Sequence, residues 1–173
     1  MKIAKGAIIG VGVLAALGAS VPGFAGGNKY ASVSDSRDCG DGDVVNWVGP
    51  IKLWPPNHKF VQTSVTADGS DSAENVSITV TPVVTDAVGG DGGPNHDPDY
   101  TPEGTPTAMG TDTATVDLGL RAERSGRGDG RTYTINWSST FDNGAKTCTS
   151  DDDGQSPFVV TVPHDMRNKH NES

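Results

Sequence analysis

The chain has 173 residues, of which 20% are charged, and its formal net charge at pH 7 is −9. Nucleic acid is excluded as a partner on this basis, because contacts with phosphates need clustered Lys and Arg. The length fits one domain with a single hydrophobic core.

The first 25 residues have the pattern of a secretory signal peptide. Lys2 and Lys5 precede an apolar run from Ala7 to Leu17 that is too short to span a bilayer, and Gly23–Ala25 is a small-x-small cleavage site. We therefore expect an exported protein whose mature chain begins near Gly26. No later stretch is long and apolar enough to predict a membrane helix.

The two cysteines, Cys39 and Cys148, are expected to form a disulfide, because exported proteins mature in an oxidising environment. Closing so long a loop is worth roughly 4 to 5 kcal/mol in chain entropy. Residues 26–43 consist largely of Gly, Asn, Ser and Asp and are expected to be a flexible N-terminal arm. Residues 44–165 are expected to form the folded domain, and residues 166–173 a polar tail.

Short segments of alternating polar and apolar residues predict strands after residue 43. Turns rich in Gly, Asp and Pro separate them, and none has helical periodicity. The pattern indicates an antiparallel immunoglobulin-like β-sandwich of about seven strands. The predicted strands are 44–48, 59–67, 76–80, 115–123, 131–138, 146–148 and 158–162. Along 115–123 the alternation predicts that Val116, Leu118, Leu120 and Ala122 point inward, and that Asp117, Gly119, Arg121 and Glu123 point outward.

Acidic residues gather in two predicted loops. Residues 86–111 have no periodicity and are expected to form one long loop, which in a compact domain is usually functional or disordered. Calcium prefers oxygen ligands of the kind these loops supply, although none matches the spacing of an EF-hand. The candidate calcium ligands are Asp91, Asp97, Asp99, Asp151 and Asp153, with Asp41 and Asp43 as a further acidic pair; solvated acidic turns are the alternative.

The segment Leu53–Lys59, with sequence LWPPNHK, has the most distinctive chemistry in the chain. Its two prolines fix φ and predict an extended polyproline II run rather than a helix. Trp54 offers a flat apolar face, followed by the polar side chains of Asn57, His58 and Lys59.

Several polar residues stand at predicted strand ends and could meet at one end of the sandwich. They are Asn57, His58, Lys59, Arg121, Glu123, Arg124, His164 and Asp165. Glu123 is expected to pair with Lys59 or Arg131, and Asp165 with His58 or an arginine. One interpretation is a polar clasp that pins the last strand. The other is a ligand-binding site, since Trp54 beside charged groups suits a carbohydrate or a peptide.

Four segments resemble those of bacterial exported modules: Leu53–Lys59, Leu120–Gly126, Gly130–Ile135 and Val162–Asp165. Such modules are similar to immunoglobulin-like and hyalin-repeat (HYR-like) sandwiches. The turn before Cys148, at Asp142–Gly144, matches their pattern approximately. The resemblance covers most of the expected domain and implies an accessory module of a secreted or surface protein, with no enzymatic activity.

The sequence thus predicts a secreted, non-enzymatic binding or structural module at the cell exterior, with calcium as a candidate stabilising ion. Its expected partners are an extracellular protein or a carbohydrate. The alternative is a small secreted metal-dependent hydrolase using His58, His164 and either Glu123 or Asp165. Catalysis would require both imidazoles to lie near one accessible point, and no Gly-x-Ser-x-Gly motif suggests a serine hydrolase.

Overall fold

A computed structural model describes residues 30–71, 74–86, 98–123 and 130–163. These residues form ten strands and one 3-10 turn, and within them no helix is long and apolar enough to cross a membrane. The strands are β1 (Val33–Gly40), β2 (Asp43–Gly49), β3 (Phe60–Asp68), β4 (Asn75–Asp86), β5 (Tyr100–Thr101), β6 (Thr107–Thr111), β7 (Thr113–Arg121), β8 (Gly130–Phe141), β9 (Lys146–Thr149) and β10 (Phe158–Pro163). The 3-10 turn, η1, spans Asp142–Gly144.

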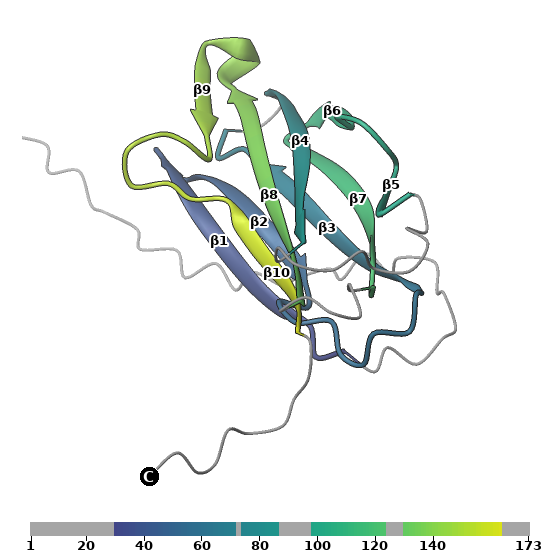
Figure 1. Ribbon diagram of the computed structural model, residues 1–173. Helices are drawn as coiled ribbons and strands as arrows, with labels where there is room; N and C mark the ends of the chain where they lie inside the picture. The colour runs from purple at the N-terminus through teal and green to yellow at the C-terminus, as the bar shows by residue number, and fades with distance from the viewer. Residues whose placement is uncertain (1–29, 72–73, 87–97, 124–129, 164–173) are drawn as a thin grey trace, which may run out of the picture.

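The strands form a sandwich of two antiparallel sheets of five strands each (Figure 1). Sheet A has the order β1-β2-β3-β7-β5. Sheet B has the order β10-β8-β4-β6, and β9 also pairs with β8. An all-β antiparallel sandwich is therefore confirmed.

One edge of sheet B is formed by two short strands, β9 and β10, that pair with successive parts of β8. β9 pairs with Ser138–Phe141 and β10 pairs with Gly130–Ile135, whereas β4 occupies the other side of β8. Residues 150–157 form the loop between these two strands. The free side of β10 is partly covered, because Leu53 N donates to Thr161 O at 2.8 Å and Thr161 N donates to Ile51 O at 3.0 Å.

The core lies between the sheets and is built from alternate residues of the long strands. Val116, Leu118, Leu120 and Ala122 are all buried, as the alternation predicts. Burial of an aliphatic or aromatic side chain of this kind contributes about 1.5 to 3 kcal/mol. Three aromatic rings pack together in the core. The Phe158 ring centroid lies 5.7 Å from that of Trp47 and 6.4 Å from that of Trp137.

The prediction of a flexible arm is wrong for residues 33–40, which form β1. This strand pairs with β2 from Val33 opposite Gly49 to Gly40 opposite Asp43. It is an edge strand with largely exposed polar residues, so its composition resembles that of a loop. Residues 26–29 lie outside the described residues.

The predicted loop at 86–111 is also partly wrong. Residues 100–101 form β5 beside β7, and residues 107–111 form β6 beside β4. Both are short edge strands with few apolar side chains, so they lack the alternation that identifies a strand from sequence. Residues 87–97, in the middle of this region, lie outside the described residues, as do residues 124–129 between β7 and β8.

The predicted disulfide between Cys39 and Cys148 is present, with the two Cα atoms 5.9 Å apart. Cys39 belongs to β1 at the edge of sheet A, and Cys148 belongs to β9 at the edge of sheet B. The bond therefore ties the two sheets together along one side of the sandwich.

Replacing both cysteines, as in Cys39→Ser/Cys148→Ser, is expected to lower the free energy of unfolding by about 4 kcal/mol, because the unfolded chain regains the entropy of a long open loop. Urea denaturation of the variant, compared with the oxidised protein, measures the loss. Reduced wild-type protein serves as the control and should behave like the variant. Equal midpoints for the oxidised and reduced proteins would contradict this role.

Candidate functional site

Three of the predicted site residues meet at the end of β7. His58 Nδ1 lies 3.4 Å from Glu123 Oε1, and Arg121 Nε lies 3.7 Å from Glu123 Oε2. Glu123 thus pairs with His58 and Arg121 rather than with the predicted Lys59 or Arg131. His164 and Asp165, together with Arg124, lie outside the described residues.

The predicted outward position of Glu123 is wrong, because its side chain is only 8% exposed. β7 ends at Arg121, and Glu123 N donates to Arg121 O at 2.8 Å, so the chain bends and the alternation of the strand no longer applies. The His58 ring beside it is 57% exposed. The pair therefore joins a surface imidazole to a buried carboxylate.

The backbone of residues 57–59 is a turn bonded to the end of β7. Asn57 N and His58 N both donate to Ala122 O, at 2.9 and 3.0 Å, and Ala122 N donates to Lys59 O at 2.9 Å. His58 has a φ of 61°, in the left-handed region. The expectation of an extended polyproline run is therefore wrong at His58, where these reciprocal bonds turn the chain.

Trp54, the aromatic residue of the predicted ligand surface, is partly buried, and Leu53 before it is fully buried in the core. The Trp54–Pro55 peptide bond is cis. Tyr30, just before β1, donates from its hydroxyl to Pro55 O at 3.2 Å. This segment is thus attached to the domain at both ends.

Arg121 uses its guanidinium group to tie two loops to β7. Its Nε donates to Pro98 O at 2.8 Å, and one terminal nitrogen donates to His58 O at 3.2 Å. The guanidinium carbon also lies 4.4 Å from the centroid of the Phe60 ring, a cation–π contact. The group is therefore bound to the protein on several sides.

Two further residues complete this site: Arg131, which the sequence suggested only as a partner of Glu123, and Tyr133, which was not predicted. Arg131 is 4% exposed and forms an ion pair with Asp99, and Tyr133 donates from its hydroxyl to Arg121 O at 2.7 Å. The signal was available, because Arg131 falls on the same inward face of β8 as Tyr133 and Ile135. A charged residue on an inward face needs a buried partner.

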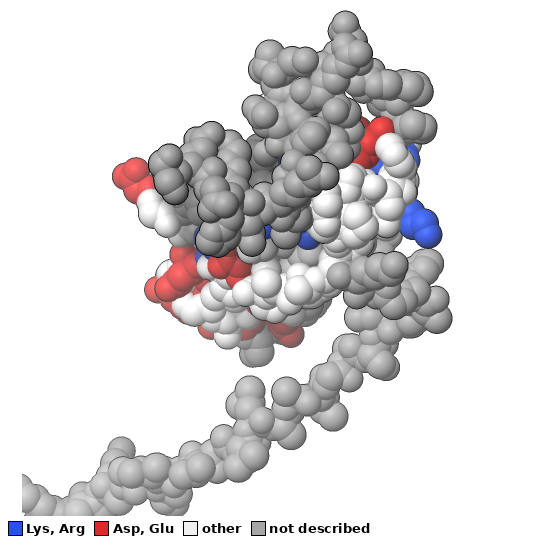
Figure 2. Space-filling view, turned by 60° about the horizontal axis from the view of Figure 1, so that its bottom comes forward, with Lys and Arg blue, Asp and Glu red and all other residues white. Residues whose placement is uncertain are grey.

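We call His58, Asp99, Arg121, Glu123, Arg131 and Tyr133 the polar cluster. Figure 2 brings the lower end of Figure 1 forward, and the described side chains visible there are mostly uncharged, with acidic and a few basic ones at the margins. Within the described ranges no group of three His, Cys, Asp or Glu side chains is placed to hold a metal ion. Chemically, the cluster joins four separate chain segments, mainly through charged groups.

The candidate calcium ligands do not form one site in the part of the chain that the structure describes. Asp99 is the counterion of Arg131. Asp151 and Asp153 are exposed on the loop between β9 and β10, where the neighbouring Asp152 accepts a bond of 2.6 Å from Thr149 N and so shapes the turn. Asp91 and Asp97 lie outside the described residues.

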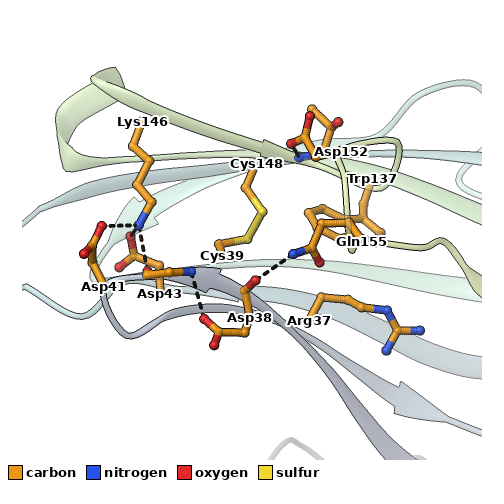
Figure 3. The surroundings of a disulfide bond; sticks show 12 residues. Arg37, Asp38, Cys39, Asp41, Asp43, Trp137, Lys146, Cys148, Asp152 and Gln155 are labelled. Carbon is orange, nitrogen blue, oxygen red and sulfur yellow. Dashed lines mark hydrogen bonds and ion pairs between the residues drawn. A yellow bond between two sulfur atoms is a disulfide. The ribbon is translucent and has the colours of Figure 1, made fainter.

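The acidic pair at the turn between β1 and β2 is bound by a lysine from the other sheet (Figure 3). Lys146 Nζ lies 3.1 Å from Asp41 Oδ2, 2.8 Å from Asp43 Oδ2 and 2.7 Å from Gly40 O. Asp43 is 1% exposed and also accepts a bond of 2.8 Å from Ser70 N. The two carboxylates therefore share the Lys146 ammonium group as their partner.

These contacts shift two pKa values in opposite directions. Burial opposes ionisation of Asp43, but the hydrogen bonds from Lys146 and Ser70 outweigh it and lower the pKa of the Asp43 carboxyl. The hydrogen bond to Asp43 is the main cause that raises the pKa of the Lys146 ammonium. Both shifts favour the ionised pair in the folded protein.

Further contacts lie on the same side of the sandwich, where β1 meets β9, β10 and the loop between them. We call this side the seam. Arg37 Nε donates to Ser156 O at 3.1 Å, and the Arg37 guanidinium carbon lies 4.6 Å from the centroid of the Phe158 ring. Gln155 Nε2 donates to Asp38 O at 2.6 Å. Together with the disulfide and Lys146, these contacts attach β1 of sheet A to the edge of sheet B.

Comparison with known proteins adds no relative to this description. No family model, curated protein or solved structure matches the chain.

Replacing Tyr133 by Phe is expected to destabilise the protein by about 1 kcal/mol, because a buried hydrogen bond to Arg121 O is lost while that carbonyl keeps its bond from Glu123 N. Urea denaturation measures the change. Tyr100→Phe is the matched control, since the Tyr100 hydroxyl donates at 3.3 Å to Gly104 O in an exposed setting where water can replace it. Equal effects of the two substitutions would contradict a structural role for the polar cluster.

Lys146→Met is expected to destabilise the protein by about 2 kcal/mol near neutral pH, because Asp43 loses a charged donor. The lowered pKa of Asp43 makes this stabilisation present above about pH 4 and lost as the pH falls through the folded pKa. The raised pKa of Lys146 makes it present below about pH 10 and lost as the pH rises through the folded pKa. Urea midpoints of the wild type and the variant should therefore converge at acidic pH; a difference independent of pH would exclude the ion pair as its cause.

Proposed function

We propose that the protein is a secreted, non-enzymatic binding or structural module at the cell exterior, with a sandwich of the immunoglobulin-like or HYR-like kind that its four motif segments resemble. The disulfide is in keeping with an oxidising environment outside the cell. The pattern of the signal peptide supports the same location.

The observation that carries the non-enzymatic part of the proposal is how the polar cluster uses its charges. Arg121 donates to two backbone carbonyls, and Arg131 is paired with Asp99 in a buried setting. These groups hold the ends of β7 and β8 and the turn at His58 in place. A catalytic site would instead direct such groups towards a position that a substrate can reach.

The pair of His58 and Glu123 is the part of the cluster that most resembles catalytic machinery, and it decides between the two hypotheses. As part of a clasp it contributes little, since ion pairs with one exposed partner are worth at most about 1 kcal/mol. As part of a hydrolase it would be indispensable.

His58→Ala is expected to lower the melting temperature slightly, and no hydrolysis of ester, peptide or glycoside substrates is expected from either the variant or the wild type. The assay uses the disulfide-bonded protein with added Zn²⁺, with added Ca²⁺ and with EDTA. Lys59→Ala, in the same turn, is the matched control for stability. Turnover by the wild type that disappears in His58→Ala but persists in Lys59→Ala would overturn the proposal in favour of a hydrolase.

The same samples test calcium as a stabilising ion. An ion that binds the folded state alone raises the free energy of unfolding by about 2.7 kcal/mol at a hundredfold excess over its Kd. A melting temperature that rises with Ca²⁺ and falls with EDTA would support calcium binding, and an unchanged melting temperature would remove calcium from the proposal.

A further inference from the structure

The described strands of sheet B carry no charged residue on their outer face, and the one charge at its margin is Lys52, which is exposed and forms a parallel bridge with Thr161 at the edge of β10. The outward positions of this face are every second residue of β4 (75–85), β8 (132–140), β6 (107–111), β9 (147 and 149) and β10 (159 and 161), and all are exposed or half-buried. They are Thr, Ser and Asn, with two Val and one Met. The outer face of sheet A, by contrast, carries Asp38, Asp68 and Asp117.

The hydroxyl groups of this face stand in register across the strands. Ser77 and Thr140 lie opposite each other with their hydroxyl oxygens 2.7 Å apart, and Thr79 and Thr107 with theirs 3.0 Å apart. A hydroxyl has one donor and two acceptor positions, so each pair keeps free acceptor capacity that can face a ligand. The bonds also fix the side-chain rotamers, which lowers the entropy cost of binding.

Apolar groups are interspersed among the hydroxyls. Val83, Val159 and Met109 are 44%, 46% and 80% exposed, and all three lie on this face. The threonine methyl groups add to them. The surface therefore alternates hydrogen-bonding and apolar patches, as a sugar ring does with its hydroxyl rim and its C–H faces.

Charge and shape narrow the class of ligand. A charged ligand would lose hydration against this face without gaining a counter-charge, and the net charge of −9 repels polyanions. A sheet face offers many similar shallow contacts, which favour a repeating polymer over a single small molecule. A second copy of the chain fits less well, because the face lacks the aromatic and arginine anchors of stable protein interfaces.

We propose that the outer face of sheet B binds an uncharged polysaccharide. This inference rests on the proposed function, a binding module at the cell exterior, and names both its ligand class and its binding surface. The surface is separate from the polar cluster, where the sequence predicts the ligand site.

The test is native gel electrophoresis of the disulfide-bonded protein through gels that contain soluble neutral polysaccharides, namely a mixed-linkage glucan, a mannan or a xyloglucan, with alginate as the acidic comparison. Thr79→Lys places a charge on the face. Thr66→Lys is the matched control on sheet A, because Thr66 is also half-buried and its hydroxyl lies 2.9 Å from that of Thr115 on the next strand. Met109→Lys is a second variant whose position is too exposed to affect folding.

The expected result is retardation by at least one neutral polysaccharide, weakened about tenfold by Thr79→Lys and by Met109→Lys but unchanged by Thr66→Lys. Migration unaffected by every neutral polysaccharide would overturn the inference, as would equal loss in Thr66→Lys. Self-association in sedimentation velocity that Thr79→Lys abolishes would assign the face to a second copy instead. A protein that binds no polysaccharide and hydrolyses nothing leaves the proposed function standing, whereas a protein that cleaves the polysaccharide overturns the proposed function but not the binding face.

Discussion

The attachment of β1 to sheet B is the constraint on which much of the sandwich depends. The inward positions of β1 are Val33, Asp35, Arg37 and Cys39, so this strand has little apolar surface of its own to bury. Besides its ladder with β2, it is held by the disulfide, by the stacking of Arg37 on Phe158 and by the bonds that cross the seam. In return, β1 covers the side of the core where Trp47 and Phe158 lie. A chain with few large apolar residues thus completes its core with a covalent bond and polar contacts.

Buried charged groups at the two ends of the sandwich have the same role, because each joins a loop to a strand of the core. Asp43 is bound by Lys146 at one end, and Arg131 by Asp99 at the other. Glu74, also buried, accepts a bond of 2.8 Å from Asp142 N and so fixes η1 to the start of β4. Each pair joins a loop to a strand of the core, and removing one partner would leave a charge in a poorly hydrated place. These charged groups at the ends of the domain therefore hold loops to the core strands.

The strands with one fully buried side were predictable from the sequence, and the edge strands β1, β5 and β6 were not. Alternation identifies β2, β3, β4, β7, β8 and β10, because each buries one full side against the core. β1, β5 and β6 bury too little apolar surface to show the pattern, and their pairing depends on neighbours distant in the chain. Glu123 was misplaced because alternation was carried two residues beyond the end of β7. The counterion of Arg131 could not be assigned, because its partner Asp99 lies in a segment without periodicity and is brought to β8 by the fold.

The outer faces of the two sheets differ in charge. Charges on a sheet discourage association with other chains, and sheet A has them: Asp68 on its outer face accepts a bond of 2.6 Å from Asn46. The outward positions of sheet B lack such charges, although the chain as a whole is acidic. Met109 is also exposed there, on the edge strand β6. Threonine is a favoured strand residue, so strand propensity alone accounts for many of the hydroxyls. It does not account for the absence of Lys, Glu and Asp from the outward positions of the described strands of sheet B, where Lys52 stands only at the margin, since any of them could occupy an exposed position at small cost in stability. A surface kept neutral in this way is better explained by a neutral ligand than by the requirements of the fold.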